Sequence, residues 1–307
     1  MGPVTIMNQI IIENYNQEWA EFFIEEAGRI VSVASECLVD IYHIGSTSVP
    51  GLSAKPIIDI IFVTTDLFKA RKILTSEKLG YRFKGEYNLP LHDLYDKQGK
   101  FKIYLHIHLY GSPEIKLNLM FRDYLRTHSE ACEEYVQAKV HASQMKDAAE
   151  KMDTGVTHYN LMKNEVITSI LKKTGFSELC VRFVTQENER KAFKHHRCFN
   201  VPGLPEIQKS KKMVLYNGVD IIEAAEFCYF EDGSSEIIFI TRETKEGFSK
   251  LIKSIEDWLK IRTSVKLLLV RVSNLNCEQD EQPIYESLGY SRDPSLRGVV
   301  MCKKLRV

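Results

Sequence analysis

The sequence lacks an excess of charge of either sign. Its 307 residues hold 41 lysines and arginines against 41 aspartates and glutamates. General nucleic-acid binding and adhesion to anionic membranes both rely on surplus positive charge. We therefore expect no general nucleic-acid binding and no membrane partner, while a local basic pocket for a small ligand stays compatible with the composition.

Long apolar runs and paired cysteines are also missing. The longest apolar stretches, residues 57–63 and 267–270, have the length of strands, whereas a bilayer-spanning helix needs about 20 apolar residues. No charged and apolar leader is visible at the amino terminus. The seven cysteines are odd in number and free of C-x-x-C spacing, which indicates free thiols rather than a zinc cluster. These features predict a cytoplasmic protein.

The length favours two domains, and we place them at residues 1–175 and 176–307, on either side of the Lys172-Lys173-Thr174-Gly175 segment. Period-2 and period-3.6 patterns predict an α+β fold. Strands are expected at 38–44, 57–64, 81–86, 91–97 and 100–110, the last three as a meander. Helices are expected from Asn16 to residue 34 and at 67–79, 115–125, 130–145 and 159–172.

The second half restarts with a strand at 179–184 and a basic helical stretch at 187–198, which we interpret as a solvated helix face. Asn217-Gly218 and Asp232-Gly233 lie between apolar runs and predict two hairpins. A helix at 248–258, a strand at 265–272, a short helix at 283–288 and a strand at 299–304 complete the expected order.

Chemistry is expected first at a Gly-Ser turn that precedes an apolar strand. A turn of small residues lets backbone N–H groups approach a phosphate, and the strand places the acidic Asp59 beside it. Two-metal catalysis needs a second converging carboxylate, but the position two residues on is Ile61, so we expect no two-metal nucleotidyl transfer. The segments are His43-Ile44-Gly45-Ser46-Thr47-Ser48-Val49-Pro50-Gly51-Leu52 and Lys55-Pro56-Ile57-Ile58-Asp59-Ile60.

Basic side chains could complete a phosphate-type anion pocket at this turn. Arg122 and Arg126 are four residues apart on one expected helix, as are Tyr159 and Lys163 on another, so each pair shares a helix face. The alternative is that Arg122 pairs with an acidic neighbour and Lys163 is only solvated. The predicted ligand-binding residues are Gly45, Ser46, Thr47, Lys55, Arg122, Arg126 and Lys163.

Two histidines could add a divalent metal ion. His106 and His108 share one face of a strand and could join Asp59 as ligands, and imidazole suits zinc, nickel or iron. The alternative is one exposed histidine and one that hydrogen-bonds a carboxylate. His43 either touches the pocket or is a satisfied, partly buried imidazole.

These two segments, with three later ones, resemble the GrpB family over residues 8–173. The resemblance implies a nucleotidyltransferase-like mixed-sheet domain, and many members resembling this chain carry a second aspartate where it has Ile61. The ligand expected from the residues is a nucleotide or another small phosphorylated molecule. The further matching segments are Leu105-His106-Ile107-His108-Leu109, Gly111-Ser112-Pro113 and Phe121-Arg122-Asp123-Tyr124-Leu125-Arg126.

Residues 178–307 resemble GNAT acyltransferases in the order of their elements and in the segment Ile284-Tyr285-Glu286-Ser287-Leu288-Gly289-Tyr290. This resemblance implies an α/β domain that transfers an acetyl group from acetyl-CoA to an amine, with Tyr285 protonating the CoA thiolate. Glu236 and Glu226 are candidate general bases, and for each the alternative is a solvent-facing strand carboxylate.

The expected CoA pyrophosphate loop departs from the GNAT pattern. Lys245 and the Gly247 amide would hold the phosphates, with help from Arg242, but Glu243 and Glu246 would repel them. The enzyme interpretation therefore competes with a binding protein whose sites are degenerate in both domains. The segment is Thr241-Arg242-Glu243-Thr244-Lys245-Glu246-Gly247-Phe248.

Overall fold

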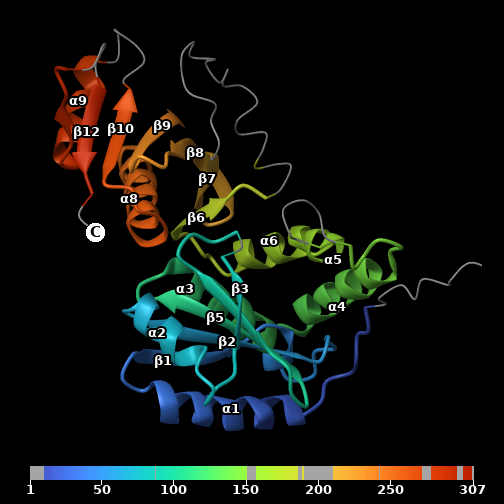
Figure 1. The fold of residues 1–307 in the computed structure, drawn as a ribbon. Helices are drawn as coiled ribbons and strands as arrows, with labels where there is room; N and C mark the ends of the chain where they lie inside the picture. The colour runs from blue at the N-terminus through green and yellow to red at the C-terminus, as the bar shows by residue number, and fades with distance from the viewer. Residues whose placement is uncertain are drawn as a thin grey trace, which may run out of the picture. The chain divides into compact units, whose positions relative to one another are not determined.

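The computed structural model describes residues 10–86, 88–150, 157–185, 189, 210–241, 243–271, 278–295 and 300–305. The chain divides into two compact units, Met1–Tyr87 with Leu91–Ser177 and Asn88–Pro90 with Glu178–Val307 (Figure 1). Among the described residues, no helix has both the length and the apolar character needed to cross a membrane.

The first unit is a five-stranded mixed sheet with helices on both faces. The strand order is β1-β2-β5-β4-β3, where β2 and β5 run parallel and the other neighbours antiparallel. The strands are β1 (Leu38–Ile44), β2 (Ile57–Thr64), β3 (Arg82–Gly85), β4 (Asp93–Lys97) and β5 (Lys102–Leu109). The helices are α1 (Glu18–Ala34), η1 (Ser46–Ser48), α2 (Leu67–Leu74), α3 (Pro113–Thr127), α4 (Ser129–Gln144), α5 (His158–Met162) and α6 (Asn164–Lys173).

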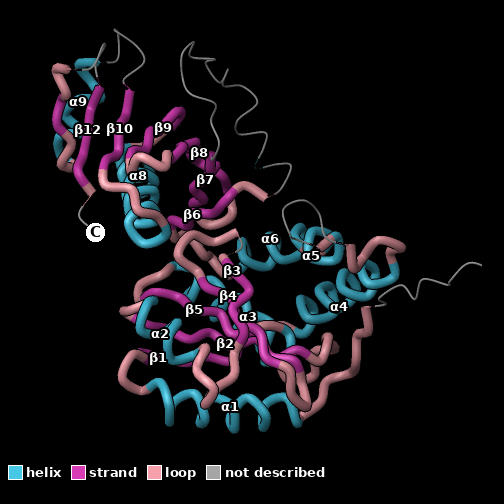
Figure 2. The backbone as a smooth tube through the Cα atoms, viewed as in Figure 1, coloured by secondary structure: helices cyan, strands magenta, loops and turns pink. Residues whose placement is uncertain are grey.

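The two faces of β2 have different neighbours. Ile60 pairs with His43, whose ring stacks on Phe23 of α1 at 4.7 Å, so α1 covers that face. Ile61 and Val63 point the other way and pack against α3, and α3 in turn contacts α4 and α6 (Figure 2). Asp59 shares this second face because side chains two residues apart in a strand point the same way.

The predicted strands 38–44 and 57–64 and the meander of β3, β4 and β5 are confirmed. The single helix predicted at 159–172 is wrong, because Lys163 ends α5 and precedes α6. The helical period continues through this break, so the apolar pattern gives no sign of it.

The second unit is a seven-stranded mixed sheet, ordered β11-β12-β10-β9-β8-β7-β6, in which only the described β9 and β10 pair is parallel. The predicted hairpins are confirmed at β7–β8 and β8–β9, and the α+β fold class is confirmed for the chain. The predicted helix at 187–198 lies outside the described residues, except for Glu189. The elements are β6 (Leu179–Phe183), β7 (Ser210–Asn217), β8 (Asp220–Tyr229), β9 (Ser234–Ile240), α8 (Lys245–Arg262), β10 (Leu267–Arg271), α9 (Glu278–Ser287), β11 (Ser291–Arg292) and β12 (Val300–Lys304).

Candidate functional site

The Gly-Ser turn packs directly on Asp59. Gly45 follows β1 with φ 69°, and a Cβ added there would lie 2.5 Å from Asp59 Oδ2. The backbone N–H and the hydroxyl of Ser48 both donate to the Gly45 carbonyl, at 3.2 and 2.6 Å. Glycine is therefore needed twice here, for the positive φ and for the close approach of a carboxylate.

His43 braces this turn from the opposite face of the sheet. The Thr47 hydroxyl donates to the Ile57 carbonyl at 2.9 Å, so the 3.1 Å contact with His43 Nε2 requires that nitrogen to be the donor. Burial, followed by the charges of Arg126 and Arg122, lowers the pKa of His43 to about 3. His43 is thus the satisfied, neutral imidazole of the two alternatives.

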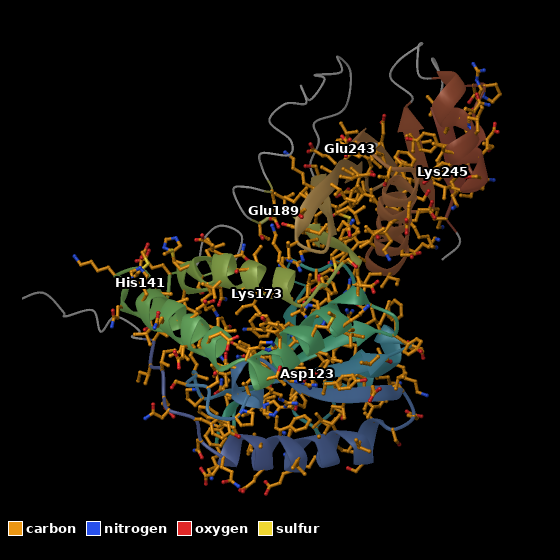
Figure 3. All side chains as sticks on the ribbon, turned by 180° about the vertical axis from the view of Figure 1, so that it is seen from behind. Asp123, His141, Lys173, Glu189, Glu243 and Lys245 are labelled. Carbon is orange, nitrogen blue, oxygen red and sulfur yellow. The ribbon has the colours of Figure 1, made fainter. Side chains whose placement is uncertain are left out.

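Arg122 and Arg126 reach the turn, as their spacing predicted, but they bind its carbonyl groups. Arg122 Nη1 donates to His43 O at 3.0 Å, and its other nitrogens pair with Asp123, which is labelled in Figure 3. Arg126 donates twice to Ser48 O, at 2.7 and 3.2 Å. The predicted anion-binding arginines are therefore largely used to hold the backbone of the turn.

Lysines form the basic part of this region. Lys55, in the loop before β2, and Lys163, at the α5–α6 break, both lie over the Tyr159 ring, with Nζ at 3.7 and 4.3 Å from its centroid. Burial lowers the pKa of each amine to about 8, against the opposing effect of Asp59. Among the described residues no ion pair is recorded for either lysine, so their charges stay available for an anion.

Two further residues near these lysines, Tyr135 and Lys139 of α4, were not predicted from the sequence. Lys139 is buried, donates to the Ser53 carbonyl and lies 4.7 Å from the Tyr135 ring centroid. The Ser46 side chain of the turn acts to lower the pKa of the buried Tyr135 hydroxyl, against the larger effect of burial, so the two side chains lie near each other. A signal was present, because Tyr135-x-x-x-Lys139 repeats the spacing of the tyrosine and lysine at 159 and 163.

A cavity of about 630 Å³ opens beside Lys55. Its walls are partly apolar, and Lys100 and Lys102 add two further amines while Glu13 adds one carboxylate. Ligand pockets typically have about 300–1,000 Å³, so this pocket has the size of a small-molecule site. Lys55 lines it, whereas Gly45, Tyr159 and Lys163 do not.

Asp59 and His106 come together, as the predicted shared face requires. His106 Nε2 lies 3.4 Å from Asp59 Oδ1, and its Nδ1 lies 3.2 Å from Nε2 of His92, a residue not foreseen from sequence. His108 is buried, its ring 4.7 Å from that of His92, and burial lowers its pKa to about 3. Within the described ranges no group of three or more potential metal ligands is found, so the divalent metal at Asp59, His106 and His108 stays a prediction.

Ile61, which stands where a second acidic metal ligand would be needed, is part of the hydrophobic core. Ile61 is fully buried and packs with Ile44, Val63 and residues of α3. An aspartate in this apolar cluster would be desolvated unless its neighbours changed as well.

Comparison with known proteins identifies this arrangement. The sequence profile described as "GrpB protein" matches residues 9–173, more than half of the chain. The chain belongs to the GrpB family. The UPF0157 protein YqkA of Bacillus subtilis is 38% identical over 128 residues, which are 41% of this chain and 37% of YqkA. The chain therefore spans little more than a third of the length of that curated relative.

Two solved structures are each similar to part of this GrpB-family chain. GrpB from Enterococcus faecalis has 29% identity and covers 53% of this chain and 98% of its own, with a TM-score of 0.46. The ribosomal-protein-S18-alanine N-acetyltransferase from Escherichia coli has 16% identity and covers 42% of this chain and 96% of its own, with a TM-score of 0.31.

In the second unit, a carboxylate of the chain itself occupies the amino terminus of α8. Glu223 Oε1 accepts hydrogen bonds from the backbone N–H of Thr244 at 3.0 Å and from its hydroxyl at 3.3 Å, and that hydroxyl accepts from the Gly247 N–H at 3.0 Å. Burial raises the pKa of Glu223. The expected phosphate-binding amide of Gly247 is thus already paired, which weighs against a CoA pyrophosphate at this helix end.

The other predicted residues of this unit differ in accessibility. Lys245 is exposed in the first turn of α8, next to Glu243 (both labelled in Figure 3), and could meet an anion from solvent. Tyr285 is buried, with its ring edge-on to Phe248 and Tyr290 at 5.4 and 5.6 Å. The two candidate general bases on strands, Glu236 and Glu226, are also buried, and Glu226 lies 3.6 Å from Lys212, so neither is the solvent-facing carboxylate of the alternative.

The packing of Glu223 on Gly247 predicts a specific coupling. A Cβ at Gly247 would lie 2.5 Å from Glu223 Oε1, so we expect Gly247→Ala to cost about 2 kcal/mol of unfolding free energy. Truncating the acid should recover about 1 kcal/mol in the double variant Gly247→Ala/Glu223→Ala, although the Thr244 hydroxyl remains 2.8 Å from the new Cβ. Urea denaturation of the native protein, the two single variants and the double variant measures the coupling between the two positions. Additive losses of unfolding free energy would contradict the contact.

Proposed function

We propose that the first unit binds a small phosphorylated ligand, with its phosphate at the Gly45–Ser46 turn and between Lys55 and Lys163. The observation that supports this most is the pair of lysines over Tyr159. Placing two half-buried amines against one ring is unfavourable unless an anion joins them. Because the arginines hold the backbone of the turn, the lysines carry the recognition of the phosphate.

The test compares oxyanion binding by the native chain and by Lys163→Met. We expect affinity for inorganic phosphate or a nucleoside monophosphate to fall about 10- to 100-fold, the value of a lost charge-assisted hydrogen bond. The free variant should be at least as stable as the native chain, because a partly buried charge has been removed. Calorimetry and thermal melting measure the two effects separately.

Lys72→Met is the matched control. Lys72 is an exposed lysine of α2 in the same unit, so its loss should leave both affinity and melting temperature unchanged. Unaltered phosphate affinity in both Lys55→Met and Lys163→Met would contradict the proposed site.

Acetyl transfer from acetyl-CoA to an amine stays a prediction for the second unit. Two observations favour it. Tyr285, the residue expected to protonate the CoA thiolate, packs against Phe248 at the start of α8, where the CoA phosphates are expected. The strand before α8 and the strand after it, β9 and β10, are parallel neighbours, as the expected order of elements requires. Against it, Glu223 occupies the helix end where the pyrophosphate is expected. Calorimetry with acetyl-CoA decides the matter, and a Glu223→Ala variant shows whether the carboxylate blocks binding.

A further inference from the structure

The lysine cluster, defined as Lys55, Lys139 and Lys163, contains more positive charge than its surroundings compensate. Lys55 and Lys163 both lie over the Tyr159 ring, with Nζ 3.7 and 4.3 Å from its centroid, and the charge of Lys163 also acts to lower the pKa of Lys139. The nearby carboxylate that favours protonation of Lys55 and Lys163 is Asp59. Three ammonium groups against one carboxylate leave a surplus of two positive charges when all are protonated.

The aromatic walls of the cluster add no compensating charge. Burial raises the pKa of Tyr135 to about 12 and that of Tyr159 further, so both phenols are neutral near pH 7. Their ring faces partly satisfy the ammonium groups. Such contacts are worth about 0.5–2 kcal/mol each, and they leave the net charge unchanged.

We propose that the lysine cluster is the site of one doubly charged oxyanion, held by the amines, and that the cluster takes up protons when the anion binds. This inference rests on the proposed anion-binding function and specifies its ligand class, a phosphomonoester dianion or an ion of the same charge. The surplus charge of the three amines, to which Lys102 beside Lys55 adds, is large enough to balance such an ion.

Proton uptake follows from the lowered pKa values of the lysines in the protein without a bound anion. Burial lowers the pKa of Lys55 and Lys163 to about 8 and that of Lys139 to about 7. Near pH 8 the free cluster therefore lacks part of its charge, and a dianion placed among the amines raises their pKa values again. Below about pH 6 all three are already protonated, so binding there needs no proton.

The groups that face these amines set the direction of the pH effect. Lys102 opposes protonation of Lys55, while Asp59 favours protonation of Lys55 and Lys163, and the Cys132 thiol faces Lys139. In the free protein the lowered lysine pKa values mean that the unfolded chain binds more protons, so stability rises as the pH passes through 7–8 toward the ordinary lysine value of 10.5. Affinity for the anion should change in the opposite direction.

The experiment is calorimetric titration of the full chain with sulfate in two buffers of different ionisation enthalpy. Sulfate stays a dianion at every pH used, so any pH dependence belongs to the protein. We expect uptake of about one to two protons per sulfate near pH 8 and almost none near pH 6. Affinity should fall about tenfold or more per pH unit above pH 8.

Variants separate this inference from the proposed function. Lys139→Met should bind sulfate with reduced proton uptake at pH 7, while Lys72→Met should behave as the native chain. Sulfate binding with the same affinity at pH 6 and pH 9 and no proton uptake would overturn the inference and leave the anion site intact. Failure of sulfate, phosphate and a nucleoside monophosphate to bind at any pH would overturn both.

Discussion

Gly45→Ala is expected to lower the unfolding free energy of the first unit by about 3 kcal/mol and to abolish oxyanion binding. The Gly45 backbone, at φ 69° and ψ −174°, lies in a region that essentially only glycine adopts, which costs an alanine about 1–3 kcal/mol. The new Cβ would also lie 2.5 Å from Asp59 Oδ2 and 3.1 Å from Asp59 Cβ, so the strand or the turn must move. Urea denaturation followed by circular dichroism measures the loss, and sulfate calorimetry measures binding.

Gly51 provides the matched control for this substitution. It also has a positive φ, of 80°, but an added Cβ there meets nothing within 4 Å. Gly51→Ala should therefore cost only the backbone strain of about 1–2 kcal/mol and should keep the site. Equal destabilisation by the two alanines would show that contact with Asp59 contributes nothing.

The second large effect is expected at Glu256 in α8 of the second unit. This buried carboxylate accepts from Lys303 Nζ at 2.8 and 2.9 Å and from the Tyr290 hydroxyl at 3.0 Å. Removing one partner of a buried ion pair costs about 3–5 kcal/mol. The Lys303 side chain is 23% exposed, and Lys260 Nζ lies 3.8 Å from the same carboxylate. We therefore expect Lys303→Met to cost about 2–3 kcal/mol, at or below the low end of that range.

A surface pair on the same helix is the control. Lys253 and Asp257 are four residues apart with Nζ and Oδ1 at 2.9 Å, and both are solvent-accessible. Lys253→Met should cost about 0.3–0.5 kcal/mol. Thermal and urea unfolding of the two variants give the comparison, and similar losses would mean that Glu256 tolerates the missing partner.

The strands around the site were predictable because their signals are local. Residues 38–44 and 57–64 are bounded by turn residues and alternate or run apolar as buried strands do, and β1 and β2 have the same bounds. The Gly45 turn was also predictable, because a glycine among small residues is typical of a turn that needs a positive φ.

The chemical roles of the charged residues were less predictable. The spacing of Arg122 and Arg126 correctly placed both on one helix face toward the turn, but spacing cannot tell a phosphate from a carbonyl group as the acceptor. The structure shows the carbonyls of His43 and Ser48 in that place. Lys139 was missed because its importance depends on Lys163, which lies 24 positions further along the chain.

The sequence by itself determined the family, the α+β class and the elements that carry the Gly45 turn and Asp59, because these depend on short-range patterns and on a long matching motif. Only the tertiary structure decided which charged side chains bind groups of the protein itself and which remain available for a ligand. It gathered Lys55, Lys139 and Lys163 from three separate segments around two tyrosines, and it placed Glu223 of β8 on the first turn of α8. The physical reason is that a buried charge is defined by the neighbours that solvate it, and those neighbours come from distant parts of the chain.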